Sequence, residues 1–495
     1  MFRFLSRLPV LVGACLFTLT AVSSASEARP NFVIVLADDL GYGDLGCYGN
    51  EIVRTPHLDR FAEEGMRFTD CYAAAANCSP SRTGLMTGRT PWRVGIHNWI
   101  PMLSPMHVRD SEITIATLLR DAGYDTCHVG KWHLNGWFNL PGQPQPGDHG
   151  FDHWFSVQNN ALPNHRDPYN FVRNGIPVGT VEGYSAGIVT DEAITWLREG
   201  REEGNPFFLF VCYHEPHEPV ATAERFTRLY ADLEDPAERA LWGNISQMDA
   251  GFGRLMAELE SLDLAEDTLV FFTSDNGPAI TGKHPYGSSG PLRAKKGYVW
   301  EGGIRVPGIL RWPGRITPGS TSEEPISGVD LLPTLCEMAG VETPKDRALD
   351  GTSLVPLVEG DALERHTPLY WHFLRSRSSV KVAIREGDWK LAARVDTPDL
   401  KPSGGITVED IEFGKQAELS EFALFNLRDD IAETTDRQAD EPSRFAEMKE
   451  RLVKKYREVR DESPTWPEWE FPRYEGQRIE WPEYRALRKP PVYEP

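Results

Sequence analysis

The residues with the clearest chemical potential lie between positions 77 and 90, where the sequence reads NCSPSRTGLMTGRT. Ser79 can cap a helix and Pro80 suits its first turn, so Cys78 is expected just outside a helix N-terminus. Free N–H groups and the helix dipole favour an anion there, and Arg82 adds a planar fork for an oxyanion. The same surroundings would activate a thiol. The stretch therefore indicates a reactive site that handles an anion.

Two pairs of oxygen-bearing side chains each follow directly on an apolar run. They are Asp38 with Asp39, and Asp275 with Asn276. Taken alone, an Asp-Asp pair reads as a helix cap and Asp-Asn-Gly as a turn. Two such pairs at matching strand ends favour a cation site, because carboxylate and amide oxygens are ligands of Ca²⁺ or Mg²⁺ rather than of zinc. The sequence therefore predicts a metal site at one edge of a sheet.

Further basic and imidazole groups follow other apolar runs or share one loop: Lys131, His133, His214, His217, Arg293, Lys295 and Lys296. A single histidine near a strand end is more often a satisfied hydrogen-bonding group than a catalyst. The basic run at 293–296 would, by itself, pass for a solvated loop. These groups gain significance only if the fold brings them beside the carboxylates.

The elements that must position these groups follow from the apolar pattern. Strands are predicted at residues 32–36, 124–129, 207–212 and 269–273. Their lack of polar alternation is typical of strands that are buried on both faces of a parallel sheet. Helices are predicted from Thr55, over 113–119 and over 245–259. This alternation predicts an α/β fold with a doubly wound, mostly parallel central sheet flanked by helices, and with sites at the carboxyl ends of the strands.

The pattern changes near residue 370. Short antiparallel strands are predicted at 380–384, 389–393 and 424–427, before a helix that carries Phe445, Met448, Leu452 and Tyr456 on one face. The Pro- and aromatic-rich tail is predicted to be irregular, with its tryptophans packed on the body. We therefore expect a catalytic domain over residues 26–370 and a smaller C-terminal antiparallel-sheet α+β region over 371–495.

Charge and the N-terminal segment narrow the class of protein. The formal net charge of −21 argues against nucleic-acid binding and requires that any anion site be built locally. Basic Arg3 and Arg7, an apolar run and the small residues 23–25 predict a signal peptide over residues 1–25. A secreted or periplasmic protein without a transmembrane anchor is expected, and residues 12–15, which read VGAC, leave a lipoprotein as the alternative.

Six cysteines remain after the predicted cleavage point: Cys47, Cys71, Cys78, Cys127, Cys212 and Cys336. Their spacing matches neither a small disulfide scaffold nor a zinc site. One or two disulfide bonds remain compatible with that spacing.

The stretch from Cys78 to Arg89 resembles the sulfatase signature C-x-P-x-R-x-x-x-x-T-G-R. Five further motifs of that family occur in family order: Asp38-Asp39, Gly130-Lys131-Trp132-His133, Pro216-His217-Glu218-Pro219, Ser274-Asp275-Asn276-Gly277, and Lys296-Gly297 followed by Glu301-Gly302-Gly303. Over most of its length the chain is thus similar to the formylglycine-dependent arylsulfatases of the alkaline phosphatase superfamily.

The resemblance implies a cofactor and a metal site. Cys78 would be oxidised to formylglycine, an aldehyde, by a maturation enzyme, and would also contact the metal. The hydrate of an aldehyde carries two hydroxyls, so that one can attack sulfur while the other later expels sulfate. The metal would be Ca²⁺, with four side-chain ligands: Asp38, Asp39, Asp275 and Asn276.

The resemblance also implies roles for the basic groups. Arg82 would hold the aldehyde hydrate, and four residues would surround the sulfate: Lys131, His133, His217 and Lys296. Lys296 is chosen over Lys295 because it directly precedes Gly297, as in the family. We hypothesise that His133 deprotonates the hydrate, and that His217 and Lys296 bind sulfate and protonate the leaving oxygen.

The implied function is hydrolysis of a sulfuric ester, with two alternatives. One is a phosphonate or phosphodiester hydrolase of the same superfamily, and the other is a catalytically silent relative that binds sulfated glycans. Trp99, Trp137 and Trp154 follow the motifs and could stack on sugar faces, although core or loop packing explains each of them equally well. A sulfated carbohydrate is the expected substrate. His214 matches no motif and is kept as a candidate pocket residue.

Overall fold

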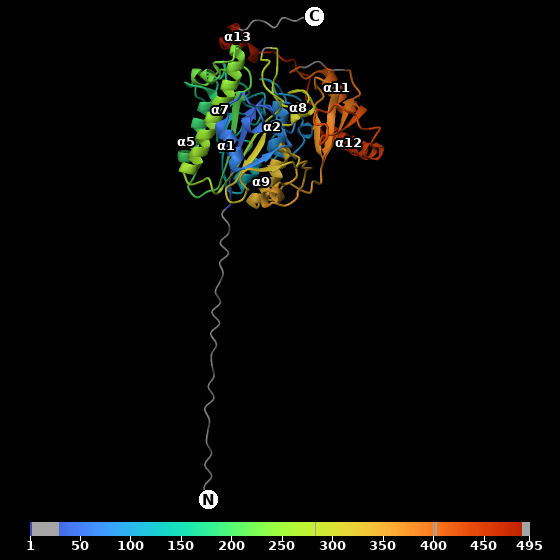
Figure 1. Cartoon of the computed structure of the whole chain (residues 1–495), viewed down its shortest axis with the longest axis horizontal. Helices are drawn as coiled ribbons and strands as arrows, with labels where there is room; N and C mark the ends of the chain where they lie inside the picture. The colour runs from blue at the N-terminus through green and yellow to red at the C-terminus, as the bar shows by residue number, and fades with distance from the viewer. Residues whose placement is uncertain (2–28, 283, 399, 401–402, 488–495) are drawn as a thin grey trace.

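The computed structural model describes residues 1, 29–282, 284–398, 400 and 403–487. The predicted signal peptide and the motif around Cys15 lie outside these residues, apart from Met1. Figure 1 shows a large body that contains a central sheet, and a smaller C-terminal part beside it that carries α11 and α12. Among the described residues, no helix is both long and apolar enough to cross a membrane.

The body is built on a ten-stranded sheet whose centre is parallel. In spatial order its strands are β11 (Ser320–Ser322), β2 (Met66–Phe68), β10 (Gly308–Arg311), β9 (Thr268–Ser274), β1 (Asn31–Asp38), β8 (Phe207–Pro216), β4 (Asp125–Lys131), β5 (His153–Val157), β6 (Val172–Arg173) and β7 (Ile176–Pro177). The five strands from β9 to β5 run parallel, whereas β10 pairs with both β9 and β2 in antiparallel fashion. The four buried runs predicted from the sequence are β1, β4, β8 and β9, so the expected fold class is confirmed.

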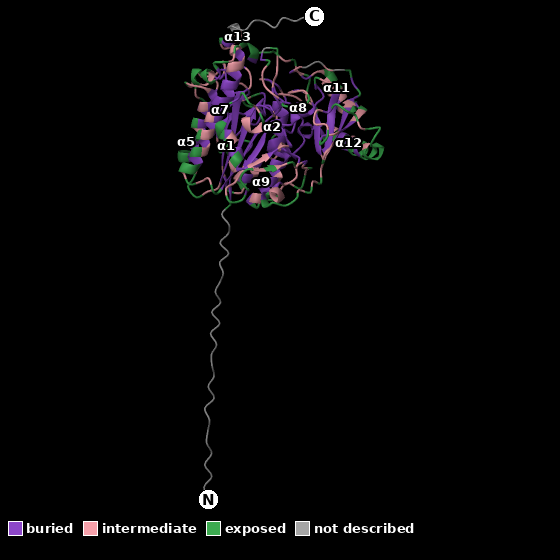
Figure 2. Cartoon of the chain, viewed as in Figure 1, coloured by how far each residue is buried: buried purple, intermediate pink, exposed green. Residues whose placement is uncertain are grey.

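Helices cover both faces of this sheet, as a doubly wound fold requires. Val33 and Val35 of β1 pack on the face covered by α1 (Pro56–Glu64), α5 (Ser185–Thr195) and α7 (Pro236–Ser261). Phe32 and Ile34 pack on the opposite face, under α2 (Cys78–Thr87), α4 (Ile115–Asp121) and α9 (Leu331–Ala339). Because both sets of alternating side chains are buried, the strand has no polar residue between Asn31 and Asp38. Figure 2 shows this core as buried, with the exposed residues on the outer sides of helices such as α5.

The C-terminal part is a four-stranded antiparallel sheet packed between a helix and the body. Its strands are β13 (Leu369–His372), β14 (Val380–Glu386), β15 (Trp389–Val395) and β16 (Leu419–Asn426). One face packs on α12 (Pro442–Glu462) through Met448, Leu452 and Tyr456. The other face packs on Trp300 and Ile304 of the body. The sheet therefore rests directly on the segment that follows Lys296.

The remaining elements are short and lie in connections: β3 (Cys71–Tyr72), β12 (Ile326–Ser327), α3 (Pro91–Val94), α6 (Glu224–Thr227), α8 (Glu301–Ile304), α10 (Val355–Glu359), α11 (Val408–Gln416) and α13 (Tyr484–Leu487). The tail predicted to be irregular contains α13, because Tyr484 packs into the core beside α7. Trp466 packs on the body as expected and donates a hydrogen bond to the Gly95 carbonyl at 2.6 Å. None of the six described cysteines forms a disulfide bond with another.

Candidate active site

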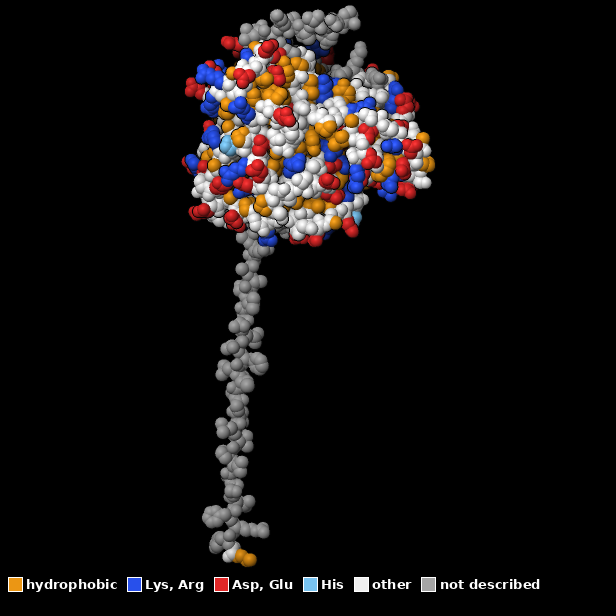
Figure 3. All heavy atoms as spheres, viewed as in Figure 1, with side chains coloured by type: hydrophobic (Ala, Val, Ile, Leu, Met, Phe, Trp, Pro, Cys, Tyr) orange, Lys and Arg blue, Asp and Glu red, His pale blue; other side chains and the backbone are white. Residues whose placement is uncertain are grey.

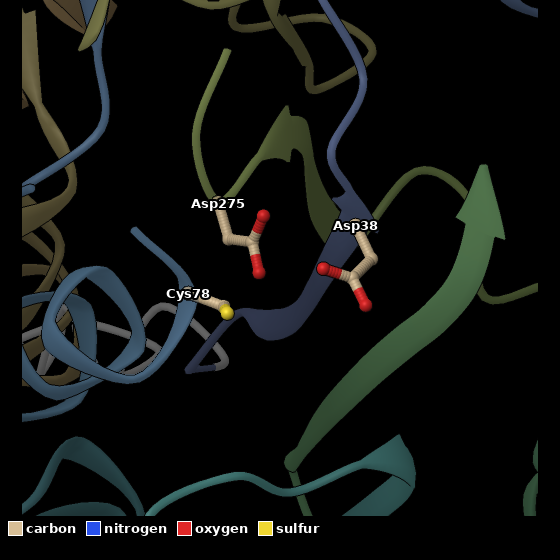
Figure 4. Close-up of side chains that lie close together, drawn as sticks. All are labelled: Asp38, Cys78 and Asp275. Atoms are coloured by element: carbon tan, nitrogen blue, oxygen red, sulfur yellow. The ribbon is translucent and has the colours of Figure 1, made fainter. Parts of the chain in front are cut away.

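The two carboxylate pairs meet because β1 and β9 are hydrogen-bonded neighbours in register. Ala37 lies opposite Ser274, so Asp38 and Asp275 leave the sheet side by side. The Asp275 N–H donates to the Ala37 carbonyl at 3.1 Å, and the Asp39 N–H donates to Asp275 Oδ1 at 3.2 Å. Figure 4 shows Asp38 and Asp275 pointing toward each other and toward Cys78. The ligand atoms of these three residues lie within 4.8 Å of one another.

Cys78 is the first residue of α2 rather than the residue before it. The cap is Asn77, whose Oδ1 accepts a hydrogen bond from the Cys78 N–H at 3.0 Å. Ser79, the cap expected from the sequence, lies inside the helix and accepts a hydrogen bond from the Ile100 N–H at 3.0 Å. Asn and Ser are almost equally good caps, so the tertiary contact decides between them.

The unmodified thiol is not activated by these surroundings. Burial raises the pKa of Cys78, and nearby Lys131 and Lys296 only partly oppose that effect. The expectation of an activated thiol is therefore wrong for the cysteine itself. The helix start supplies N–H groups, but the side chain is only 3% exposed and the cost of burying a charge dominates.

Three cations hold the carboxylates in place. Lys131 Nζ lies 2.6 Å from Asp38 Oδ2, and Lys296 Nζ lies 2.5 Å from Asp39 Oδ1. Arg82 donates to Asp275 Oδ2 from Nε at 3.0 Å, with Nη2 at 2.9 Å, while its Nη1 donates to the Lys131 carbonyl at 2.9 Å. Arg82 and Lys131 are almost completely buried, so these are desolvated, charge-assisted contacts.

Three buried oxygens of this cluster have no hydrogen-bond partner among the described residues. They are Asp38 Oδ1, Asp39 Oδ2 and Asn276 Oδ1. Arg82 Nη2 lies 3.9 Å from Asp38 Oδ1, and the imidazole Nε2 of His217 lies 3.5 Å from Asp39 Oδ2. Buried acceptors are almost always satisfied, so this set points to a bound cation with oxygen ligands.

The two neighbouring aspartates are electrostatically distinct. Burial alone would raise the pKa of Asp38, but Lys131, then His217 and Arg82, hold it well below its usual range. For Asp275, burial and the negative charge of Asp38 outweigh Arg82, and its pKa rises to about 7. Close carboxylates titrate apart in this way unless a cation lies between them.

The two motif histidines present opposite ring nitrogens to the site. His133 Nε2 donates to the Ile100 carbonyl at 3.0 Å, which leaves Nδ1 as a buried acceptor without a partner among the described residues. His217 Nδ1 donates to the Glu218 carbonyl at 2.5 Å, so that Nε2 faces Asp39. Burial, followed by Lys131 and Arg82, lowers the pKa of His133 well below its usual value. Burial also lowers the pKa of His217.

A cavity of about 280 Å³ opens above Cys78. Four of the predicted residues line it, namely Cys78, His133, His217 and Lys296. Lys131 and the metal-site aspartates lie outside its lining, with Lys131 fully buried against Asp38. The structure thus gathers all ten predicted site residues in one region and separates those that face the cavity from those behind it.

Of the other candidate residues from the sequence, some line the cavity and others lie outside it. Trp99 lines the cavity, whereas Trp137 donates a hydrogen bond to the Leu103 carbonyl at 3.2 Å and Trp154 packs on Phe138. His214 is buried beside Phe171 and is not a lining residue of the cavity. Of the basic run, Arg293 donates to the Glu433 carbonyl and Lys295 donates to the Ile280 carbonyl, so Lys296 alone reaches the carboxylates.

Several lining residues were not singled out in the sequence: Asn77, Asn98, Asn159, Phe373, Arg375, Arg377 and Ser403. Most come from connections that carry no apolar period and no spaced motif. The one local signal that could have indicated some of them is the pair of arginines in the LRSRSS run near residue 375, because two cations in a short loop can form part of an anion site.

Comparisons with known proteins match this architecture. A family model described as Sulfatase matches residues 30–341, and one described as N-sulphoglucosamine sulphohydrolase, C-terminal, matches residues 294–401. Steryl-sulfatase of Mus musculus is 32% identical over 496 aligned positions, which cover 80% of this chain and 77% of the relative. N-acetylgalactosamine-6-sulfatase of Sus scrofa is 36% identical over 391 positions, which cover 73% of this chain and 71% of the relative.

Among solved structures, Ps i-CgsB in complex with k-i-k-neocarrahexaose superimposes with a TM-score of 0.76 at 26% identity, covering 91% of this chain and 96% of that chain. The sequence match spans more than half of the chain, and the fold match nearly all of it. Cys78, Arg82 and the paired carboxylates, which were singled out from the sequence, lie together in one cluster. The chain therefore belongs to the sulfatase family and is a sulfuric ester hydrolase.

Proposed function

We propose that this sulfatase releases sulfate from a sulfated carbohydrate, using a formylglycine made from Cys78 and a Ca²⁺ ion. The observation that carries the proposal is the convergence of Cys78 with buried carboxylates whose outer oxygens lack partners among the described residues, at the end of a cavity. The donor set consists of oxygens, which suits Ca²⁺ and, less closely, Mg²⁺. Asp38, Asp39, Asp275 and Asn276 would hold the ion.

The chain's own residues can perform the supporting steps. When present, an aldehyde hydrate at position 78 supplies the attacking oxygen, and the metal stabilises charge on the sulfate oxygens. Arg82, fixed by Asp275 and by the Lys131 carbonyl, lies one helical turn from Cys78 and orients that side chain. His133 offers an unpartnered Nδ1 that can accept a proton. Lys296 brings a positive charge to the same wall.

His217 is the proposed proton donor to the leaving oxygen. Its Nδ1–H donates to the Glu218 carbonyl, which fixes the ring with Nε2 toward the cluster. The proton given to the leaving oxygen must therefore be carried on Nε2 by the imidazolium form, which burial opposes and the negative charges of Asp38 and Asp39 favour. His217→Ala should reduce turnover of a saccharide sulfate far more than turnover of an aryl sulfate, whose leaving group needs little protonation. Exposed His57 provides the matched control, His57→Ala. Equal losses on both substrates would remove the proton-donor role.

Trp99 supports a carbohydrate substrate. It lines the cavity and is held edge-on by Phe471, with ring centroids 5.2 Å apart and an interplanar angle of 89°. Gly404 permits this arrangement, because a Cβ there would lie 2.6 Å from Trp99 Cζ2. A fixed indole face is a common platform for sugar rings. The names of the relatives, which include an N-acetylgalactosamine-6-sulfatase, support the same class of substrate.

The decisive experiment combines a mass measurement with a rate. The Cys78 peptide of protein made alongside a maturation enzyme is expected to carry the aldehyde, and that protein should release sulfate from 4-nitrophenyl sulfate. A matched phosphate diester should be hydrolysed more slowly. An unmodified thiol under conditions that mature a control sulfatase would overturn the formylglycine assignment. Faster hydrolysis of the diester would favour the phosphodiesterase alternative.

Export of the chain is also proposed, from the sequence of residues 1–25. N-terminal sequencing of protein recovered from the host is expected to begin after the small residues 23–25. A lipid-bearing N-terminus at Cys15 would instead identify a lipoprotein.

A further inference from the structure

Part of the cavity wall comes from a loop between two strands of the C-terminal sheet, and this loop lies beside Gly297. Phe373, Arg375 and Arg377, in the connection between β13 and β14, line the cavity together with Ser403. The body contributes the side chains around the reacting sulfate, which include Cys78. Groups of the substrate that do not react can therefore face the loop at 373–379.

The two arginines of this loop have different partners. Arg375 is 7% exposed and binds Asp410 through Nε at 2.7 Å and Nη2 at 2.5 Å. Arg377 is exposed, and the described residues offer its guanidinium no ion-pair or hydrogen-bond partner. Lys296, the third cation of the lining, is paired with Asp39. Within the described part of the chain, Arg377 is thus the one cavity-lining cation without a carboxylate.

Arg377 is also held next to the residue that contacts the sulfate. Its backbone N–H donates to the Gly297 carbonyl at 2.9 Å. A Cβ built on Gly297 would lie 3.2 Å from Arg377 Nε and 3.4 Å from its Cδ, so the side chain lies across this glycine. Gly297 directly follows Lys296, and consecutive Cα atoms are about 3.8 Å apart. The unpaired guanidinium therefore lies against the residue that follows Lys296, and both cations line the same cavity.

We infer that Arg377 binds a second anionic group on the carbohydrate, and that the preferred substrate is a saccharide with two neighbouring anions. This inference rests on the proposed function, because it assigns the second anion relative to the sulfate that is cleaved. The guanidinium fork suits a planar carboxylate of a uronic acid or the oxygens of a second sulfate ester. Because the protein carries a net charge of −21, an unpaired cation in the cavity provides local attraction that the overall charge does not.

The test compares three probes: N-acetylgalactosamine 6-sulfate, its 4,6-disulfate, and the 6-sulfate linked to a uronic acid. The first probe carries one anion. The second probe adds a second sulfate and the third adds a carboxylate, so the two together distinguish which kind of second anion is recognised. For the wild type, kcat/KM should be at least about tenfold higher for whichever second anion is recognised, mainly through a lower KM. Arg377→Gln should abolish that ratio, and Arg377→Lys should restore it only in part, since a point charge lacks the fork.

A charge-matched control is Arg444→Gln, on α12 outside the cavity lining, which should leave the ratio unchanged. The same three saccharides are titrated into Cys78→Ala protein, where binding is measured without turnover. Tighter binding of a doubly charged probe, lost in the Cys78→Ala/Arg377→Gln protein, supports the inference even if no ester is cleaved. Equal affinity for all three probes, or a ratio unaffected by Arg377→Gln, would overturn it, whereas failure of turnover alone would count against the proposed catalytic function.

Discussion

Two buried clusters of charge in this protein differ in how completely their oxygens are satisfied. In the catalytic cluster, one oxygen each of Asp38, Asp39 and Asn276 lacks a hydrogen-bond partner among the described residues. The second cluster joins the C-terminal sheet to the body and contains Lys390, Arg305 and Arg385 opposite Glu301, Glu433 and Asp70. Both contain three basic and three acidic side chains, so the number of charges does not distinguish them.

In the second cluster every carboxylate oxygen has a donor or a cation at 2.9 Å or less. Glu433 Oε1 has no hydrogen bond among the described residues and is compensated by its ion pair with Lys390. Lys390 Nζ lies 2.9 Å from Glu301 Oε1 and 2.8 Å from Glu433 Oε1. The Tyr72 hydroxyl donates to Glu301 Oε2 at 2.6 Å, and the Glu301 N–H donates to Glu433 Oε2 at 2.7 Å. Asp70 contacts both arginines, at 2.6 and 2.7 Å. A buried cluster that satisfies itself holds two parts together, whereas one that leaves acceptors open is built to receive something.

The largest expected effect is loss of the proposed nucleophile. Cys78→Ala should reduce turnover of any sulfate ester by on the order of 10⁴-fold or more, because the formylglycine proposed to carry the covalent intermediate cannot form. The thermal midpoint should change little, since the thiol makes only a long contact of 3.4 Å with Asn77 Oδ1. Rates and melting curves check both claims, with Cys47→Ala as a cysteine control outside the cavity. Retained turnover would require another nucleophile.

Metal removal tests the open acceptors directly. Chelation should lower activity by about 100-fold or more, and Ca²⁺ should restore it. A ligand that binds only the folded state stabilises it by about 2.7 kcal/mol at one hundred times its Kd, so Ca²⁺ should raise the thermal midpoint. Asp39→Asn should weaken that rise, because one oxygen ligand loses its charge. Identical melting curves with and without Ca²⁺ would contradict the metal assignment.

Removing one lysine from each cluster should separate rate from stability. Lys296→Met should reduce kcat by on the order of 100-fold with a small change in thermal midpoint, since Asn276 still donates to Asp39 at 2.7 Å. Lys390→Met leaves Glu301 and Glu433 without their shared cation and should cost about 3–5 kcal/mol of folding stability. With Ca²⁺ present, Lys296→Met should mainly lose activity and Lys390→Met should mainly lose stability. A comparable loss of stability in both would erase the distinction between the clusters.

The smallest effect concerns the pH dependence of the second cluster. Lys390 is shared by two carboxylates, and burial raises the pKa of Glu433 to about 7 although Lys390 opposes it. A carboxyl whose pKa is higher in the folded state binds its proton more tightly there. Wild-type stability should therefore decline as the pH rises from the usual glutamate range, about 4.3, to about 7.

Glu433→Gln cannot titrate and should lack that decline. Relative to wild type, the free energy of unfolding of the variant should increase between pH 5 and pH 8, by roughly 1 kcal/mol for each unit of pKa shift. Thermal unfolding of both proteins at the two pH values measures this difference. Parallel pH profiles would show that Glu433 is ionised throughout.

Much of the fold and the catalytic cluster could be predicted because the relevant signals are local. A strand buried on both faces reads as a continuous apolar run, so the sudden appearance of Asp38 or Asp275 marks its carboxyl end. Residues that depend on the C-terminal sheet could not be found in this way. Arg377 reaches the cavity because β13 and β14 pack on the body, and no periodicity in its own segment records that contact.

The second charged cluster could not be predicted from the sequence for the same reason. Glu301, Lys390 and Glu433 are far apart in sequence. Lys390 and Glu433 belong to none of the motifs, and the motif that contains Glu301 gives no sign of an ion pair. Only the packing of the small sheet on the body brings them together. The antiparallel strand β10 was likewise not predicted, because its four residues, GILR, are too few to show a pattern.

The position of β1 has a consequence for biosynthesis. It is the first strand to be made, yet its neighbours in the sheet are β8 and β9, where Phe32 pairs with Phe208 and Leu269. At 5–20 residues per second these partners emerge roughly 10 to 40 s later. During that interval the segment NFVIVLAD is an unpaired, apolar stretch of high strand propensity, the kind that associates with other chains. The same strand that later carries Asp38 into the cluster with Cys78 is thus a part of the nascent chain that needs protection from association until its partners are made.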